Sequence, residues 1–415
     1  MGAESTVRRF VGRRRRELGV GKEAFVPLTH IPGEEAEVDW YEAQVEFPWG
    51  AETMQFFSMR ACFSGREFHI AFPRQTQQAF IEAHIAAFKY FGGVFQTVRY
   101  DNLKSAVTRV LRGRKRIESD RFVALRSHYL FASVFCLPGV KGAHEKGGVE
   151  GGLGRFRRNH LVPVPVVDDL AALNRMLLDK CAQDDLRRIE GHTQTIIEDW
   201  GQELKALQSL PSKPFSASEN STAQVNSKGM ISVRTNRYSV PIRLAHLRVE
   251  YRLHATRLEV VYGGKVVAQH PRLQETHGVR VELDHYLELL WRKPGALSRS
   301  LPLKQARERA EWPVVYDRMF VEMQARFDAA EAARQMLTVL MLHREAPADD
   351  VGVAVSLALE HGCHSASAIA VLLRHLQSDE SSVAPLDNIG DLVAYDRPMS
   401  TLCDYDRLLN GGRVH

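Results

Sequence analysis

Cysteine is scarce in this sequence of 415 residues, which contains five cysteines, at positions 62, 136, 181, 363 and 403. None of them forms the closely spaced pairs that bind zinc, and their scatter does not suit a disulfide framework. Long apolar runs are also lacking. No stretch approaches the roughly 20 apolar residues that a membrane span requires, and the N-terminus has no apolar signal segment. We therefore expect a protein of the reducing cytoplasm with no membrane partner.

Hydrophobic residues make up 44% of the chain and charged residues 25%, which is typical of a globular protein large enough for two or three domains. The net charge of +5 is modest, but the basic residues are clustered, and such clusters suit a polyphosphate partner such as DNA. Each cluster taken alone is equally typical of a solvated surface. The basic candidates for DNA contact are Arg8, Arg9, Arg13, Arg14, Arg155, Arg157 and Arg158.

The first segment, residues 1–30, contains a short basic helix predicted over residues 5–19, where Val7, Phe10 and Val11 recur at helical spacing. It is typical of the last helix of a helix-turn-helix motif whose earlier helices are absent from this sequence. We therefore expect residues 1–30 to be the remnant of an N-terminal DNA-binding region followed by a basic linker.

Residues 31–165 alternate between β and α patterns. Three β-rich runs separated by turn residues predict an antiparallel meander, and helices and short strands then alternate. The order β-β-β-α-β-α-β-α is that of the ribonuclease H-like fold, with a mixed five-stranded sheet and helices. The predicted strands are 37–47, 53–63, 67–73, 96–100 and 130–137, and the predicted helices are 76–91, 120–129 and one that begins near Glu150.

The remaining chain divides by composition into three parts. Residues 166–224 predict a helical segment followed by a linker rich in Ser and Pro. Residues 225–275 contain short alternating strands with a Gly263-Gly264 hairpin turn, and they predict a small β-barrel. Residues 276–415 predict a helical C-terminal region that ends in a polar, mobile tail.

Three carboxylates in the predicted α/β core are candidate metal ligands. Asp39 lies within an apolar strand, where a charge is costly unless it is paired, although strand alternation would equally direct it to solvent. Asp101 follows a predicted strand, which suits a ligand site but also an ordinary turn. Glu150 begins a predicted helix, where it suits either a metal site or the helix dipole.

The expected topology would bring these three carboxylates together, because strands one and four are neighbours and the helix after strand five packs across them. Three adjacent carboxylates cannot all stay ionised without cations, and hard oxygen ligands suit two Mg²⁺ or Mn²⁺ ions. Two such ions support in-line phosphoryl transfer. Asn102, Lys104, His144 and Lys146 flank the candidates and suit contact with a scissile phosphate, but they are equally typical of surface and turn residues.

Several motifs resemble those of the IstA transposases, the larger protein of the IS-twenty-one insertion sequences. They are Glu37–Trp40 (EVDW), Phe91–Val94 (FGGV), Tyr100–Val107 (YDNLKSAV), His144–Glu150 (HEKGGVE) and Thr235–Pro241 (TNRYSVP). The resemblance implies an integrase-type catalytic core in which Asp39, Asp101 and Glu150 form a DDE triad of metal ligands. It also implies hydrolysis that frees a 3′-hydroxyl at each transposon end, followed by attack of that hydroxyl on target DNA.

The resemblance further implies partners. A homo-oligomer would hold paired transposon ends, and a smaller ATPase of the IstB type would assist with target DNA. The sequence has no Gly-x-x-x-x-Gly-Lys-Ser/Thr loop, so we expect ATP to be used by that partner. Two alternatives stay open: a ribonuclease H-like nuclease that only hydrolyses, and a non-enzymatic DNA-binding protein derived from a degraded transposase.

Overall fold

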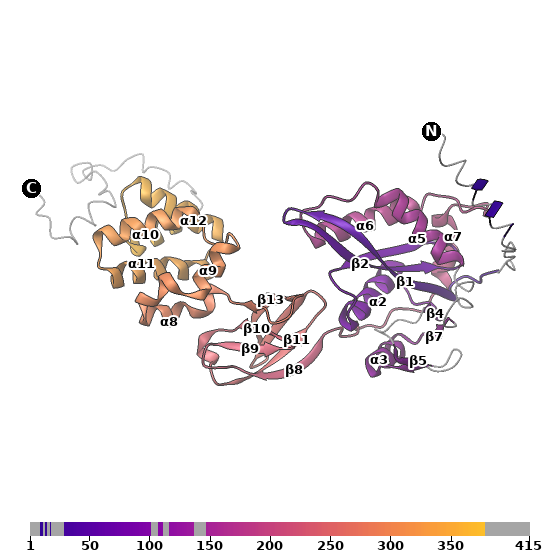
Figure 1. The fold of residues 1–415 in the computed structure, drawn as a ribbon, viewed down its shortest axis with the longest axis horizontal. Helices are drawn as coiled ribbons and strands as arrows, with labels where there is room; N and C mark the ends of the chain where they lie inside the picture. Colours follow the sequence, from indigo (N-terminus) through magenta and orange to yellow (C-terminus); the bar gives the residue numbers. More distant parts are fainter. Residues whose placement is uncertain are drawn as a thin grey trace, which may run out of the picture. The chain divides into compact units, whose positions relative to one another are not determined.

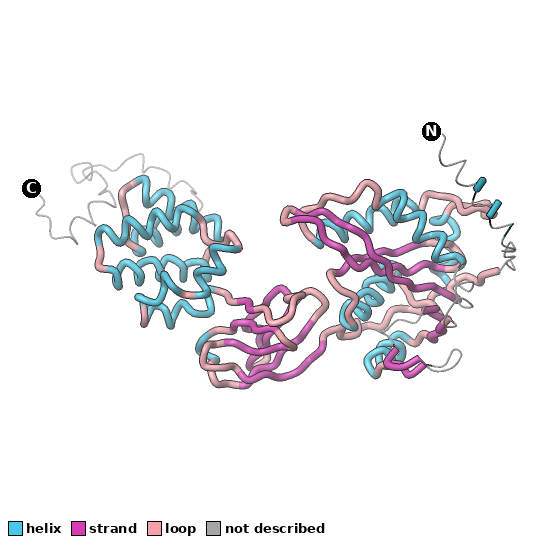
Figure 2. Tube along the Cα trace, viewed as in Figure 1, coloured by secondary structure: helices cyan, strands magenta, loops and turns pink. Residues whose placement is uncertain are grey.

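The computed structural model describes residues 29–100, 107–110, 116–136 and 147–377, together with five residues near the N-terminus. The chain divides into two compact units, and each is considered by itself. Unit 1 comprises Met1–Glu219 and His254–Thr256, and unit 2 comprises Asn220–Leu253 and Arg257–His415. Figure 1 labels their elements and Figure 2 separates helix from strand. No described helix has the length and apolar character needed to cross a membrane.

A five-stranded mixed sheet, in the order β3-β2-β1-β4-β7, forms the centre of unit 1. The first three strands pair antiparallel, whereas β4 pairs parallel with both β1 and β7. This arrangement fits the ribonuclease H-like core predicted from the order of elements. The strands are β1 Glu35–Phe47, β2 Gly50–Ala61, β3 Glu67–Phe72, β4 Thr97–Tyr100 and β7 Ala132–Phe135.

Helices cover both faces of this sheet (Figure 1). α2 and α3 pack against one face of the sheet and form a hydrophobic core with it. α5 and α6 form a second hydrophobic core with the other face. α2 begins after the N-cap Thr76 and ends at Gly92, whose φ of 71° suits glycine. The helices of unit 1 are α2 Gln77–Phe91, α3 Asp120–Tyr129, α5 Gly147–His160, α6 Leu170–Asp184 and α7 Ile196–Ala206.

The core on the α2 face is rich in aromatic rings and contains one buried histidine, His84. Its Nδ1 lies 2.7 Å from the carbonyl oxygen of Phe80 and donates to it, so its Nε2 accepts from the hydroxyl of Tyr100 at 2.9 Å. Burial lowers the pKa of His84 to about 4, so the ring is neutral. His84 therefore has a structural role in this core.

The outer edge of β3 is capped by a side chain of α6. The Asn174 side chain accepts from the backbone N–H of Ala71 at 2.7 Å and donates to the carbonyl oxygen of the same residue at 3.1 Å. Both backbone groups of Ala71 on this edge are therefore satisfied without another strand.

Two elements of unit 1 and its border were not predicted. β5 Val107–Val110 and β6 Arg116–Glu118 form a hairpin. β8 Glu219–Gln224 occupies the end of the predicted linker. The linker prediction was therefore wrong for residues 219–224. Both errors have the same cause, because these strands are short and lack the apolar alternation that identifies a strand.

Unit 2 begins with two small sheets, in the orders β13-β12-β11-β8 and β14-β10-β9, which contribute to one apolar core around Ile231, Tyr238 and Leu258. The Gly263-Gly264 turn joins β12 to β13, and both glycines have positive φ, as predicted. Closure of these sheets into a barrel stays a prediction. The further strands are β9 Met230–Val233, β10 Asn236–Ser239, β11 Arg248–Leu253, β12 Arg257–Tyr262, β13 Lys265–Pro271 and β14 Val279–Arg280.

Helices fill the rest of the described part of unit 2 and surround a separate core that includes Met319, Met336, Leu337 and Val355. Residues 378–415, for which a mobile tail was predicted, lie outside the described residues. The helices are α8 Leu287–Arg292, α9 Leu301–Glu308, α10 Val314–Arg326, α11 Ala329–Met341, α12 Ala348–Glu360 and α13 Ala366–Gln377.

Candidate active site

Asp39 lies in the middle of β1, opposite Ser58 of β2. Its neighbour Val38 is fully buried in the core of the α2 face, so strand alternation places Asp39 on the opposite face, together with Tyr41 and α5. Its side chain is partly buried, and its Oδ1 accepts a hydrogen bond from the backbone N–H of Trp40 at 2.9 Å. The carboxylate is therefore held against the sheet on the face that α5 covers.

The register of the sheet brings the end of β4 beside Asp39. β1 and β4 are parallel neighbours, and Val38 is paired with Tyr100, the last residue of β4. This confirms the predicted adjacency of the first and fourth strands. Asp101 follows Tyr100 in the chain, but Asp101, Asn102 and Lys104 lie outside the described residues, so their positions stay predictions.

The third candidate, Glu150, belongs to α5, for which the structure describes the backbone of this residue but not its side chain. Three residues further on, Leu153 is buried, and Phe156 is fully buried beside Tyr41 in the core of the same sheet face. The helix after the fifth strand therefore packs on the face that carries Asp39, as predicted. His144 and Lys146 lie outside the described residues.

A network of buried charges attaches α5 to the sheet. Arg155 donates to Glu67 of β3 at 3.2 Å and to Asp184 of α6 at 2.7 Å, and its side chain is only 17% exposed. His160, at the end of α5, lies 3.1 Å from the other oxygen of Asp184. Arg60 of β2 lies 3.8 Å from Glu67. The charge of Arg155 is therefore satisfied inside the protein.

Aromatic contacts continue this network towards Asp39. The ring of His69 stacks on that of Phe156, with 3.7 Å between centroids. His69 Nε2 lies 3.4 Å from Glu67 and donates to it, and its Nδ1 is hydrogen-bonded to the hydroxyl of Tyr41 at 3.1 Å. Burial raises the pKa of Tyr41 well above its usual value, so this hydroxyl stays protonated. His69 therefore has a structural role between β3 and α5.

The basic candidates for DNA contact fall into two groups. Arg157 and Arg158 are exposed on α5, as are Arg9, Arg13 and Arg14 near the N-terminus, whereas Arg8 lies outside the described residues. Arg155 is not exposed like these residues, because its guanidinium group forms ion pairs with Glu67 and Asp184. We therefore remove Arg155 from the set of expected DNA contacts.

Sequence reasoning missed the residues that position α5, namely Glu67 and Asp184. Ion pairs between residues 88 and 29 positions apart leave no periodic pattern in a sequence. One local signal was present, because α5 contains an unusual number of glycines for a helix, and such glycines indicate a close approach to a neighbouring element.

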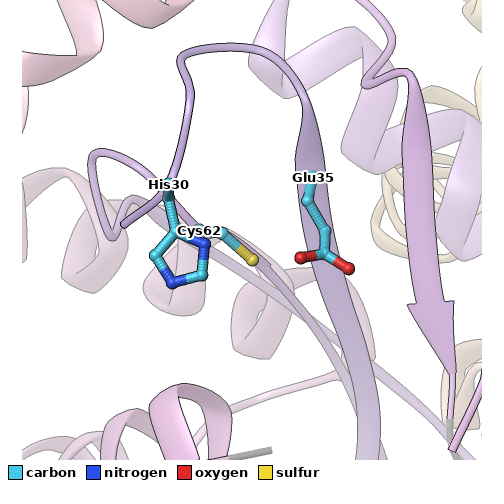
Figure 3. Close-up of side chains that lie close together, drawn as sticks. All are labelled: His30, Glu35 and Cys62. Carbon is cyan, nitrogen blue, oxygen red and sulfur yellow. The ribbon is translucent and has the colours of Figure 1, made fainter. Parts of the chain in front are cut away.

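A second group of potential metal ligands lies at the start of β1 (Figure 3), where atoms of His30, Glu35 and Cys62 are within 4.8 Å of one another. Its surroundings do not favour a cation. The Glu35 carboxylate already accepts from the Arg99 guanidinium, and the shortest distance between these two groups is 2.6 Å. Burial raises the pKa of the Cys62 thiol far above its usual value. Arg60 and Arg99 add positive charge beside His30. We assign no metal to this group.

Comparisons with known proteins identify the family. A transposase of Aminobacter aminovorans is 31% identical over 403 residues, which is 95% of this chain and 77% of the relative. The transposase for the insertion sequences IS1326/IS1353 of Pseudomonas aeruginosa is also 31% identical, over 94% of this chain and 75% of the relative. The transposase for IS21 of the same organism is 30% identical over 62% of this chain and 66% of the relative. The chain belongs to the IS21-type transposase family.

The family membership agrees with the resemblance drawn from the motifs. Residues 210–282 match the family model for the C-terminal domain of Mu transposase, which places the two small sheets in a known transposase module. Among solved structures, the HTLV-2 integrase catalytic core domain in complex with magnesium aligns with 42% of this chain and 99% of that chain, at 14% identity and a TM-score of 0.30. The assignment of the core fold rests on its own strand order.

Proposed function

We propose that this transposase frees the 3′ ends of an insertion sequence and transfers them into target DNA in a metal-dependent reaction, with Asp39, Asp101 and Glu150 as the metal ligands. The observation that supports the site most directly is the pairing of Val38 with Tyr100. One residue further along the chain from each member of this pair is Asp39, which lies within β1, and Asp101, which follows the last residue of β4 in the sequence. α5, which contains Glu150, packs on the face that carries Asp39.

The proposed cofactor is a pair of Mg²⁺ or Mn²⁺ ions, and the chemistry of three carboxylates supports this choice. The Asp39 carboxylate is partly buried, and one of its oxygens accepts from the backbone N–H of Trp40. This hydrogen bond fixes the orientation of the carboxylate. Carboxylate oxygens are the ligands that these hard cations prefer. When bound, two such ions supply activation of the attacking oxygen and stabilisation of the leaving oxygen. In this proposal the register of β1 positions Asp39, and the packing of α5 on the same face of the sheet positions Glu150.

DNA contact is proposed for the exposed arginines of α5 and of the N-terminal segment, because exposed guanidinium groups pair readily with phosphates. We also propose a homo-oligomer on paired ends and an ATPase helper of the IstB type. The proposed functional divisions of the chain are residues 1–30, 31–165, 166–224, 225–275 and 276–415. We also propose that the two small sheets close into a barrel. The proposed DNA contacts are Arg8, Arg9, Arg13, Arg14, Asn102, Lys104, His144, Lys146, Arg157 and Arg158.

A joining assay tests the proposed activity. Purified chain with Mg²⁺ or Mn²⁺ should join a precut oligonucleotide of its own transposon end to a plasmid. Asp39→Asn, Asp101→Asn and Glu150→Gln should each reduce joining below detection, because each removes a charged oxygen ligand. Asp179→Asn, on an exposed position of α6, is the matched control and should join like the wild type.

The alternatives predict other outcomes of the same assay. Full joining by the three variants would show that the ligands lie elsewhere. Cleavage without any joined product would favour a nuclease that only hydrolyses. Sequence-specific DNA binding that is unaffected by divalent ions, with neither product, would favour a DNA-binding protein without enzymatic activity.

A further inference from the structure

α5 is a poor helix by sequence, because five of its 14 residues are glycine. Glycine disfavours helix interiors, since it loses more backbone freedom on folding than other residues and contributes no side-chain packing. A short helix of this composition depends on tertiary contacts for its stability and position. The contacts of α5 with the sheet therefore determine where its first turns lie.

One of these contacts is a close approach at Gly152. A Cβ atom added at this position would lie 2.2 Å from Oε1 of Glu67, so a side chain here requires Glu67 to move. Glu67 is buried, with 5% exposure, and is held by Arg155 at 3.2 Å and His69 at 3.4 Å. The backbone of α5 therefore rests against a carboxylate that is itself fixed.

The electrostatic state of Glu67 agrees with this role. Burial alone would raise the pKa of Glu67, but the hydrogen bond from His69 and the positive charges of Arg155 and Arg60 lower it below the usual value. The group therefore stays ionised and keeps its hold on Arg155. Arg155 lies one turn beyond Gly152, so the helix meets the same carboxylate at two points, and Asp184 holds Arg155 from α6.

We propose that Glu67 is a positioning residue for the metal site, which sets the distance of α5 from the sheet through Gly152 and Arg155. This inference rests on the proposed function of Glu150, which lies two residues before Gly152 on the same helix. A displacement at Gly152 moves the backbone at Glu150 with it. Groups that orient metal ligands typically change metal affinity by roughly 10-fold to 100-fold when they are altered.

Two variants test this role, and Mn²⁺ binding followed by electron paramagnetic resonance gives a readout that does not depend on turnover. Gly152→Ala and Glu67→Gln should each weaken Mn²⁺ binding to the full chain by at least about 10-fold. In joining assays they should raise the Mg²⁺ concentration needed for half-maximal rate, while the rate at saturating Mg²⁺ recovers.

Gly154→Ala is the matched control, because the added methyl group approaches only Arg158, an exposed and flexible side chain, at 3.1 Å. It should bind Mn²⁺ like the wild type. Circular dichroism and hydrogen exchange in α2 confirm that each variant is folded. If a variant unfolds, Arg155→Lys replaces it. Lysine keeps the charge but cannot reproduce the guanidinium contacts with Glu67 and Asp184, so this variant should weaken Mn²⁺ binding as well.

The outcomes are distinguishable. Wild-type Mn²⁺ affinity in folded Gly152→Ala and Glu67→Gln would overturn the positioning role while leaving the metal site intact. An equal loss in Gly154→Ala would overturn it too, because the effect would then come from glycine flexibility rather than from Glu67. Mn²⁺ binding that Asp39→Asn does not alter would instead refute the proposed metal site, and this inference with it.

Discussion

The two faces of the central sheet in unit 1 are held by different kinds of contact. On the α2 face, fully buried rings such as Phe80, Phe88 and Phe122 pack against the sheet. On the α5 face, the apolar core is smaller, and buried ion pairs of Glu67 and Asp184 supplement it. Apolar burial is strong but non-directional, whereas ion pairs contribute less stability and specify geometry. The directional contacts occur on the face of the sheet that carries Asp39, one of the proposed metal ligands.

The largest expected effect is on the apolar face. Phe88→Ala should lower the free energy of unfolding of unit 1 by about 3–5 kcal/mol, because it leaves a cavity among Tyr129 and Phe131. Native-state hydrogen exchange in α2 measures this free energy. A loss below about 1 kcal/mol would show that this face can collapse around the cavity, and the contrast between the two faces would fail.

Acid should also act on the apolar face, through His84. Its folded pKa of about 4 lies below its ordinary value of 6.5, so the unfolded state binds the proton first as the pH falls. Stability should therefore be complete above pH 6.5 and decrease by about 3 kcal/mol towards pH 4. His84→Leu combined with Tyr100→Phe should flatten this part of the stability profile. An unchanged slope in the double variant would assign the acid sensitivity to other groups.

On the charged face, Arg155 and Arg158 form a natural pair for comparison. Arg155→Ala should cost about 2 kcal/mol of stability, because Glu67 and Asp184 lose their partner in a largely buried site. Arg158→Ala should change stability by less than about 0.5 kcal/mol, but it should reduce the salt dependence of DNA binding by about one phosphate contact. Urea unfolding measures the change in stability, and DNA binding at several salt concentrations measures the salt dependence. Equal effects on stability would remove the distinction between the two arginines.

The smallest effect is expected in α5 itself. Gly154→Ala should raise stability by up to about 1 kcal/mol, since alanine is the better helix former and the added methyl group meets only the end of the exposed Arg158 side chain. Hydrogen exchange along α5 should slow accordingly. A decrease in stability would mean that Gly154, like Gly152, lies at a close contact.

The sequence predicted the sheet well because alternation and turn residues are local signals. It could not decide the orientation of Asp39, since a strand with apolar residues on both faces offers two directions; the structure places it on the α5 face. The hairpin β5–β6 and strand β8 escaped prediction because they are short and show no apolar alternation. The pairing of Glu67 with Arg155 escaped it because the contact depends on tertiary folding, which places two distant residues together.

The cap that Asn174 places on Ala71 has a consequence for assembly. An exposed sheet edge is a template on which a strand from another molecule can add itself. At Ala71 that template is already occupied by a side-chain amide that mimics a neighbouring strand. In the homo-oligomer proposed above, contacts at this position would therefore be made by side-chain surfaces rather than by a continuous intermolecular sheet.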